Sequence, residues 1–103
     1  MKIALFLTTQ QRGIRMVQQN ITVKNKIGIH SRPAALLVDT ASRFKSKITI
    51  KNGERSALTT SMVKLLALRV KQDNEITIMA EGEDETEAVK ALSELIESNF
   101  GED

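Results

Sequence analysis

The chain has 103 residues, of which 41% are hydrophobic and only three, Phe6, Phe44 and Phe100, are aromatic. This length suits one domain, whose core must be built from Ile, Leu, Val and Ala. The absence of cysteine excludes disulfides and thiol chemistry and is compatible with a reducing cytoplasm. A net charge of +2, with acidic and basic residues interspersed and few aromatics, argues against nucleic acid as a partner.

Residues 1–15 differ from the rest of the chain. Their apolar run is far shorter than the roughly 20 residues that cross a bilayer, and it lacks the features of a secretory signal. We expect a soluble, cytoplasmic protein without membrane insertion. Because Met16 is a second plausible start and termini with few apolar anchors stay mobile, residues 1–15 are expected to be a flexible extension or a mis-assigned start. An extra strand or docking arm is the alternative, and the domain itself spans residues 16–103.

The first half of the domain begins with a strand. Period-two alternation places it from Val17 to Val23, with one face buried. A loop follows, in which Gly28 can adopt a backbone conformation that other residues resist. We expect a helix capped by the hydroxyl of Ser31, with Pro33 in the first turn, where a missing N–H costs nothing. Apolar residues at helical spacing carry it to residue 44 or 45: Ala34, Leu37, Val38, Ala41 and Phe44.

A hairpin and a short helix come next. Alternation predicts a strand over residues 48–51, and Asn52-Gly53 is a strong signal for a tight turn into a return strand over residues 55–58. A helix then follows Ser61, which is a competent cap. This helix is too apolar for one narrow buried stripe, so its surplus hydrophobic residues are expected to form an exposed patch that meets a partner.

The last elements are a strand over residues 75–80 and a closing helix. Asp84 and Glu87 suit a capping-box-like start, and Gly101 suits the stop. The element order, strand-helix-strand-strand-helix-strand-helix, implies an α+β fold. We expect an open-faced β-sandwich, in which a four-stranded antiparallel sheet carries three helices on one face. The buried positions of the closing helix are Val89, Leu92, Ile96 and Phe100.

The chemistry of the chain centres on His30, its only histidine, at the predicted helix start. One histidine and no cysteine give no metal site, and no nucleotide-binding glycine loop is present, so no metal or cofactor is expected. A neutral imidazole can accept a phosphoryl group, while helix-start N–H groups and the guanidinium of Arg32 attract phosphate oxygens. A surface histidine before an ordinary helix is the alternative, and spacing alone leaves both open.

Ser61 also has two interpretations. A serine that opens an apolar helix is most often an N-cap. A phosphate there would place about two negative charges beside the apolar surface of the helix and would block or create partner contacts. The surface in question comprises Met62, Lys64, Leu65 and Leu66.

Three segments resemble the HPr family, the histidine-containing phosphocarriers of the bacterial sugar phosphotransferase system. They are Gly28-Ile29-His30-Ser31-Arg32-Pro33-Ala34-Ala35, Ser61-Met62-Val63-Lys64-Leu65 and Glu81-Gly82-Glu83-Asp84-Glu85. The resemblance extends from Met16 to about Phe100 and implies the same open-faced sandwich.

The resemblance implies a relay in which His30 accepts phosphate from enzyme I on Nδ1 and donates it to IIA domains. It makes Arg32 the residue that assists transfer, and the protein a carrier rather than an enzyme. In many members the residue matching Ser61 is a target of HPr kinase/phosphorylase. Lys64, however, replaces a glycine of the members regulated in this way. A monomer is the default for a domain of this size.

Two alternatives to the carrier remain. One is a regulatory interaction module controlled through Ser61 and the neighbouring apolar helix. The other is a compact α+β ligand-binding domain unrelated to phosphate. A labile phosphate on His30 distinguishes the carrier from both.

Overall fold

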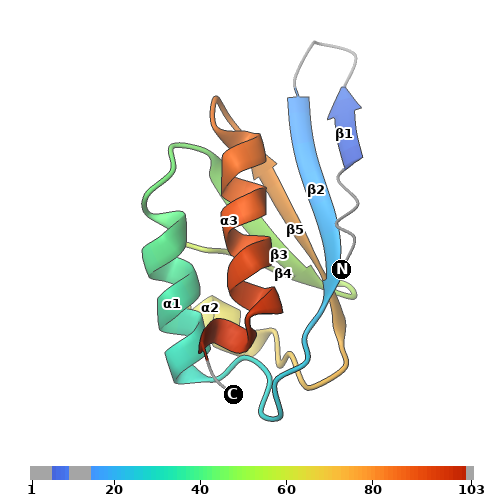
Figure 1. Ribbon diagram of the computed structural model, residues 1–103, viewed down its shortest axis with the longest axis vertical. Coiled ribbons are helices and arrows are strands. Elements are labelled where there is room, and N and C mark those ends of the chain that lie inside the picture. The colour runs from blue at the N-terminus through green and yellow to red at the C-terminus, as the bar shows by residue number, and fades with distance from the viewer. Residues whose placement is uncertain (1–5, 10–14, 102–103) are drawn as a thin grey trace.

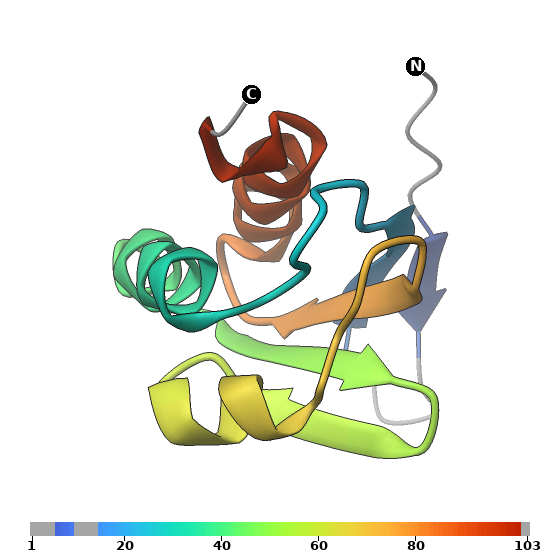
Figure 2. The same ribbon diagram turned by 90° about the horizontal axis from the view of Figure 1, so that it is seen from below.

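The computed structural model describes residues 6–9 and 15–101. Figure 1 shows the helices gathered on one side of a twisted sheet, and Figure 2 looks nearly along α1 and α3 as they lie over that sheet. The elements in chain order are β1 (Phe6–Thr9), β2 (Arg15–Thr22), α1 (Ser31–Ala41), β3 (Lys47–Asn52), β4 (Arg55–Leu58), α2 (Met62–Ala67), β5 (Glu75–Glu81), α3 (Glu85–Glu97) and the 3₁₀ turn η1 (Asn99–Gly101).

The sheet is antiparallel throughout and has the strand order β1-β2-β5-β3-β4. Strands β2 to β5 with the three α-helices form the expected α+β open-faced sandwich, which is confirmed. The turn at Asn52-Gly53 joins β3 to β4 as predicted, with Asn52 opposite Arg55. Gly53 has a φ of +64°, the left-handed conformation that such tight turns require.

Strand β1 adds a fifth strand that pairs with β2, from Phe6 opposite Gln18 to Thr9 opposite Arg15. For residues 6–9 the structure therefore has the extra strand rather than a tail. This pairing occupies the outer edge of β2, whose backbone groups would otherwise be open. The boundary at residue 16 stays a prediction, because residues 1–5 and 10–14 lie outside the described part of the chain.

The core lies between the sheet and the helices. In β2 and just beyond it, the predicted inward positions Val17, Gln19, Ile21 and Val23 are all buried. Val17 lies opposite Ala80 and Ile21 opposite Ile76, so two neighbouring strands present apolar residues to the same side. The helices cover this layer with fully buried side chains that include Leu37, Leu92 and Ile96.

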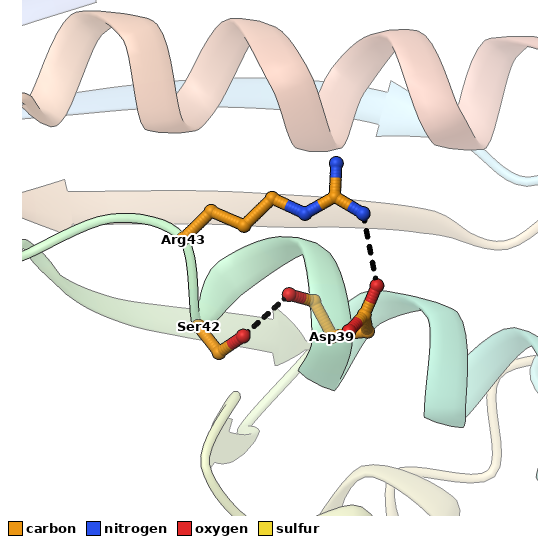
Figure 3. A network of polar contacts seen from close by, with 3 residues as sticks. All are labelled: Asp39, Ser42 and Arg43. Atoms are coloured by element: carbon orange, nitrogen blue, oxygen red, sulfur yellow. Dashed lines mark hydrogen bonds and ion pairs between the residues drawn. The ribbon is translucent and has the colours of Figure 1, made fainter.

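Helix α1 ends at Ala41, earlier than the spacing predicts. The N–H of Ser42 bonds to Val38 and Thr40, and the next residues tighten into i→i+3 bonds, so Phe44 lies beyond the helix. Figure 3 shows the side chains that close this end: Ser42 Oγ donates to the carbonyl of Asp39 at 2.6 Å. Arg43 Nη2 donates to the carboxylate of the same aspartate at 3.0 Å.

Asp84 holds the N-cap position of α3, but the predicted capping box is wrong. Its side chain makes no cap hydrogen bond to the helix. It accepts instead from the backbone N–H groups of Lys45 and Ser46 and from the Ser46 hydroxyl. Glu85, rather than Glu87, reaches back, with Oε1 accepting from the N–H of Gly82 at 3.1 Å. The carboxylate of Asp84 thus ties α3 to the segment that leads into β3.

Candidate functional site

His30 is the N-cap residue of α1, with an extended backbone (φ −112°, ψ −167°). The expectation that Ser31 caps this helix is wrong by one position. The N–H of Ala34 bonds to the carbonyl of His30 at 2.9 Å, so the helix already includes Ser31 in its first turn. The imidazole therefore occupies the place from which a cap side chain accepts hydrogen bonds, and it makes no such bond itself.

The loop before His30 is held by the segment that follows α2. The N–H of Ile29 donates to the carbonyl of Val70 at 3.1 Å. Within the loop, the buried Asn25 donates through Nδ2 to the carbonyl of Gly28 at 2.7 Å. Gly28 has a φ of +78°, and a Cβ on it would lie 2.2 Å from the carbonyl oxygen of Val70. Only glycine permits this approach, which fixes the direction from which the chain enters α1.

The start of α1 suits an anion. The first N–H groups of a helix have no partner within it, and Pro33 has none, so Ser31 and Arg32 supply the available backbone donors. No acidic residue lies in the first turn to offset the positive end of the helix dipole. The side chains of Ser31 and Arg32 are both exposed. Arg32 therefore adds a charged, forked donor beside a half-buried imidazole.

The two ring nitrogens of His30 are placed differently. The residue as a whole is half-buried, and its Nε2 atom is buried. A reactant from solvent therefore cannot reach Nε2 unless the ring rotates.

Ser61 is the N-cap of α2, as predicted. Its Oγ accepts from the N–H of Lys64 at 3.2 Å, and its carbonyl accepts from the N–H of Leu65 at 3.0 Å. The residue is half-buried. Figure 2 shows α2 beside α1, and the two helices are in contact. Ser61 and His30 thus belong to neighbouring helices, each as the N-cap.

The predicted partner surface on α2 needs one correction. Leu65 is fully buried and belongs to the core, since it shares the inward face of this short helix with Leu68 three residues on. Val63, which the prediction left out, is 77% exposed. Met62 and Leu66 are half-buried and Lys64 is exposed, as a partner surface requires. Helical spacing alone did not show which side of so apolar a helix faces outward.

Ile27, in the loop before His30, is a second exposed hydrophobic residue, at 69%. The sequence signal for it was available, because a large aliphatic residue in a polar loop next to a reactive group is a candidate contact. Among the described residues no group of three His, Cys, Asp or Glu side chains is placed to hold a metal ion. No helix in the described part of the chain is long and apolar enough to cross a membrane.

Comparison with known proteins decides the family. Residues 17–98 match the family model described as "PTS HPr component phosphorylation site". The chain belongs to the HPr family. It is 40% identical over 88 residues to the phosphocarrier protein HPr of Xylella fastidiosa (strain Temecula1), which covers 85% of this chain and 99% of that protein.

Solved HPr structures have the same fold. HPr from Thermoanaerobacter tengcongensis is 46% identical, with a TM-score of 0.80 over 84% of this chain and 97% of that one. Crh, a catabolite repression protein of Bacillus subtilis, is 35% identical, with a TM-score of 0.65 over 76% of this chain and 90% of that one. The protein is thus an HPr-type phosphocarrier of the phosphotransferase system, a carrier rather than a catalytic enzyme.

Proposed function

We propose that His30 is the phosphoryl acceptor, that enzyme I is the donor, and that sugar-specific IIA domains are the recipients, in the cytoplasm. The observation that carries the proposal is the N-cap position of the imidazole. A cap side chain normally accepts hydrogen bonds from first-turn N–H groups, and the imidazole of His30 makes no such cap bond. A phosphoryl group on the ring supplies the missing acceptor oxygens at the positive end of the helix.

The transfer step exchanges one phosphorus bond for another. The lone pair of Nδ1 attacks the phosphorus of the donor as the bond between phosphorus and the donor breaks. The buried position of Nε2 supports Nδ1 as the attacking atom. Because the phosphoryl group passes between two nitrogen atoms when donor and acceptor are both histidines, the exchange is readily reversible, as a relay requires.

Charge on the moving phosphoryl group is stabilised by fixed donors. The N–H groups of Ser31 and Arg32 are held by the helix, so they need no reorganisation as charge develops. The guanidinium of Arg32 adds paired donors that match phosphate oxygens. The exposure of Arg32 leaves it free to follow the phosphoryl group between partners.

The docking surface for enzyme I and IIA domains is proposed to combine α2 with the loop before α1. Val63 and Ile27 supply exposed hydrophobic area, with the half-buried Met62 and Leu66 beside Val63. Exposed aliphatic residues of this kind are suited to a partner that must dock and leave. Lys64 adds a positive charge at the rim of this surface.

The experiment is phosphoryl transfer from phosphoenolpyruvate and enzyme I to the wild-type protein, to His30→Ala and to Ser31→Ala. The wild type should gain one phosphate, detected by mass, and lose it on acid treatment. His30→Ala should gain none, whereas Ser31→Ala should still be phosphorylated. An acid-labile phosphate on His30→Ala would contradict the assignment of the acceptor.

A second function, regulation through Ser61, is favoured by its N-cap geometry. A phosphate on Oγ would lie at the start of α2, near the N–H of Lys64 that Ser61 already binds. It would also bring negative charge next to Val63 on the proposed docking surface. An HPr kinase/phosphorylase should add an acid-stable phosphate that Ser61→Ala does not accept. If no cognate kinase modifies the wild type, this function is absent.

A further inference from the structure

A cavity lies at the opposite end of α1 from His30. Its volume is about 580 Å³, which lies within the range typical of small-molecule sites. Helix α1 has 11 residues, so this end lies roughly 16 Å from the helix start. The cavity and the phosphoryl site are therefore separate on the surface.

Apolar side chains form most of the cavity wall. They come from the end of α1, the segment after it, and strands β3 and β4: Val38, Ala41, Phe44, Ile48 and Leu58. Val38 and Phe44 pack against the core while staying half-buried, and Leu58 is 40% exposed. This wall can therefore receive an apolar group from solvent without unfolding any element.

Three of the four hydroxyl groups that line the cavity are already used within the protein, and the fourth belongs to the exposed Thr60. Ser42 donates to the carbonyl of Asp39, as Figure 3 shows. Ser46 donates to Asp84, and Thr59 donates to the carbonyl of Ile48 at 3.2 Å. These hydrogen bonds stabilise the wall, so their donors are not available to a ligand.

Two lysines supply the positive charge at the cavity. Lys45 and Lys47 both line the cavity and both are exposed. Within the described part of the chain, neither ammonium group makes an ion pair. Glu81 lies opposite Lys47 in the β3–β5 register without pairing with it, and the Asp84 carboxylate is occupied by backbone and hydroxyl donors. The rim is therefore positively charged around an apolar wall.

We propose that this cavity binds a small amphipathic anion, with an aliphatic or aromatic body against the wall and a carboxylate or phosphate head at Lys45 and Lys47. Area removed from water drives the body into the cavity. The two ammonium groups select the charge of the head, because they are unpaired cations beside a partly desolvated surface. No acidic side chain lines the cavity to repel such a head.

The test uses decanoate as the anionic probe and decanol as its neutral counterpart, both below the concentrations at which they form micelles. Binding is followed residue by residue through the amide NMR signals of the ¹⁵N-labelled full chain. Decanoate should shift the signals of the lining residues to a saturating limit and bind more tightly than decanol. His30→Ala should bind decanoate as the wild type does, which separates this site from the phosphocarrier function.

Variants of the rim and wall sharpen the result. The double variant Lys45→Gln/Lys47→Gln should weaken decanoate about three- to tenfold, the range of two partly exposed ion pairs, and should leave decanol unchanged. Lys71→Gln/Lys90→Gln removes two exposed lysines that do not line the cavity and should change neither. Leu58→Glu places a carboxylate in the wall and should abolish decanoate binding. Val63→Glu, at a more exposed position on α2 that does not line the cavity, should not.

Three outcomes would overturn the proposal. Scattered or non-saturating shifts would show no defined site. Equal binding of decanol and decanoate, unaffected by the lysine changes, would show an apolar groove without selection for anions. Tighter binding of an acidic peptide with a central phenylalanine than of decanoate would assign the cavity to a protein segment instead.

Discussion

One carboxylate oxygen of Asp84 accepts two hydrogen bonds from Ser46: Oδ1 accepts from the Ser46 hydroxyl at 2.5 Å and from the Ser46 backbone N–H at 3.0 Å. The Ser46 hydroxyl is the main cause of a lowered pKa for Asp84, and the N–H of Lys45 adds to it. These bonds favour the ionised carboxylate. They connect the start of α3 to the segment before β3.

The hydrogen bonds to the Asp84 carboxylate should make the free energy of unfolding depend on pH. Because the pKa of Asp84 is lower in the folded state, its ionised form stabilises the fold above the ordinary carboxyl value of about 4. That contribution is lost as the pH falls through the folded-state pKa. The difference in free energy of unfolding between wild type and Asp84→Asn should therefore be largest near neutral pH and should shrink below about pH 4.

Urea unfolding between pH 7 and pH 2.5 measures this difference. Glu83→Gln is the control, since the neighbouring Glu83 is exposed and makes no side-chain hydrogen bond or ion pair in the described part of the chain. A wild-type advantage over Asp84→Asn that is as large at pH 2.5 as at pH 7 would show that ionisation is not its source.

Arg32 should affect rate rather than stability. Arg32→Ala removes a charged donor from the transferring phosphoryl group and should slow transfer from enzyme I by about tenfold or more. Arg32→Lys keeps the charge but loses the fork, so an intermediate rate is expected. Stopped-flow or quench-flow phosphorylation measures the effect. Because Arg32 is exposed, urea midpoints should not move; an unchanged rate for Arg32→Ala would remove it from the site.

Substitutions at Leu65 and Val63 should distinguish a residue that packs in the core from one that contacts a partner. Leu65→Ala leaves a cavity in the core and should cost about 2–5 kcal/mol of unfolding free energy. Val63→Ala is an exposed change and should alter stability by no more than about 0.5 kcal/mol, while weakening the complex with enzyme I. Urea unfolding and isothermal titration calorimetry measure the two effects. The assignment of faces fails if Val63→Ala is the more destabilising change.

Arg69 is held in a conformation that suits glycine. It follows the end of α2 with a φ of +54°, and its N–H bonds to the carbonyl of Leu66. Arg69→Gly should raise the free energy of unfolding by about 0.5–1 kcal/mol, because glycine adopts this conformation without steric cost. Lys71→Gly, two residues on and without a positive φ, should lower it. Equal effects of the two changes would contradict the explanation.

Several parts of the fold were predictable because their cause is local. The alternation from Val17 to Val23 defines the buried face of β2, and Asn52-Gly53 defines the β3–β4 turn. The position of Ser61 as a cap is equally local. In each case neighbouring residues determine the structure, so no distant contact has to be known.

Other parts depend on contacts that the sequence order does not reveal. The prediction of a capping box at the start of α3 is wrong because the Asp84 carboxylate accepts hydrogen bonds from residues far earlier in the chain. The prediction for Leu65 is wrong because five of the six residues of α2 are apolar, so packing rather than the sequence pattern selects the inward face. His30, not Ser31, became the N-cap because the bond from Ala34 starts the helix one residue earlier. Even so, both histidine and arginine were located at the correct helix end.

The close approach of Gly28 to Val70 also has a consequence for synthesis. The loop that carries the imidazole rests on a carbonyl that leaves the ribosome well after His30 itself. Strand β2 likewise waits for β5, its main neighbour in the sheet. A nascent chain that ends before residue 70 lacks the carbonyl that holds this loop. The folded position of His30 therefore depends on the second half of the chain.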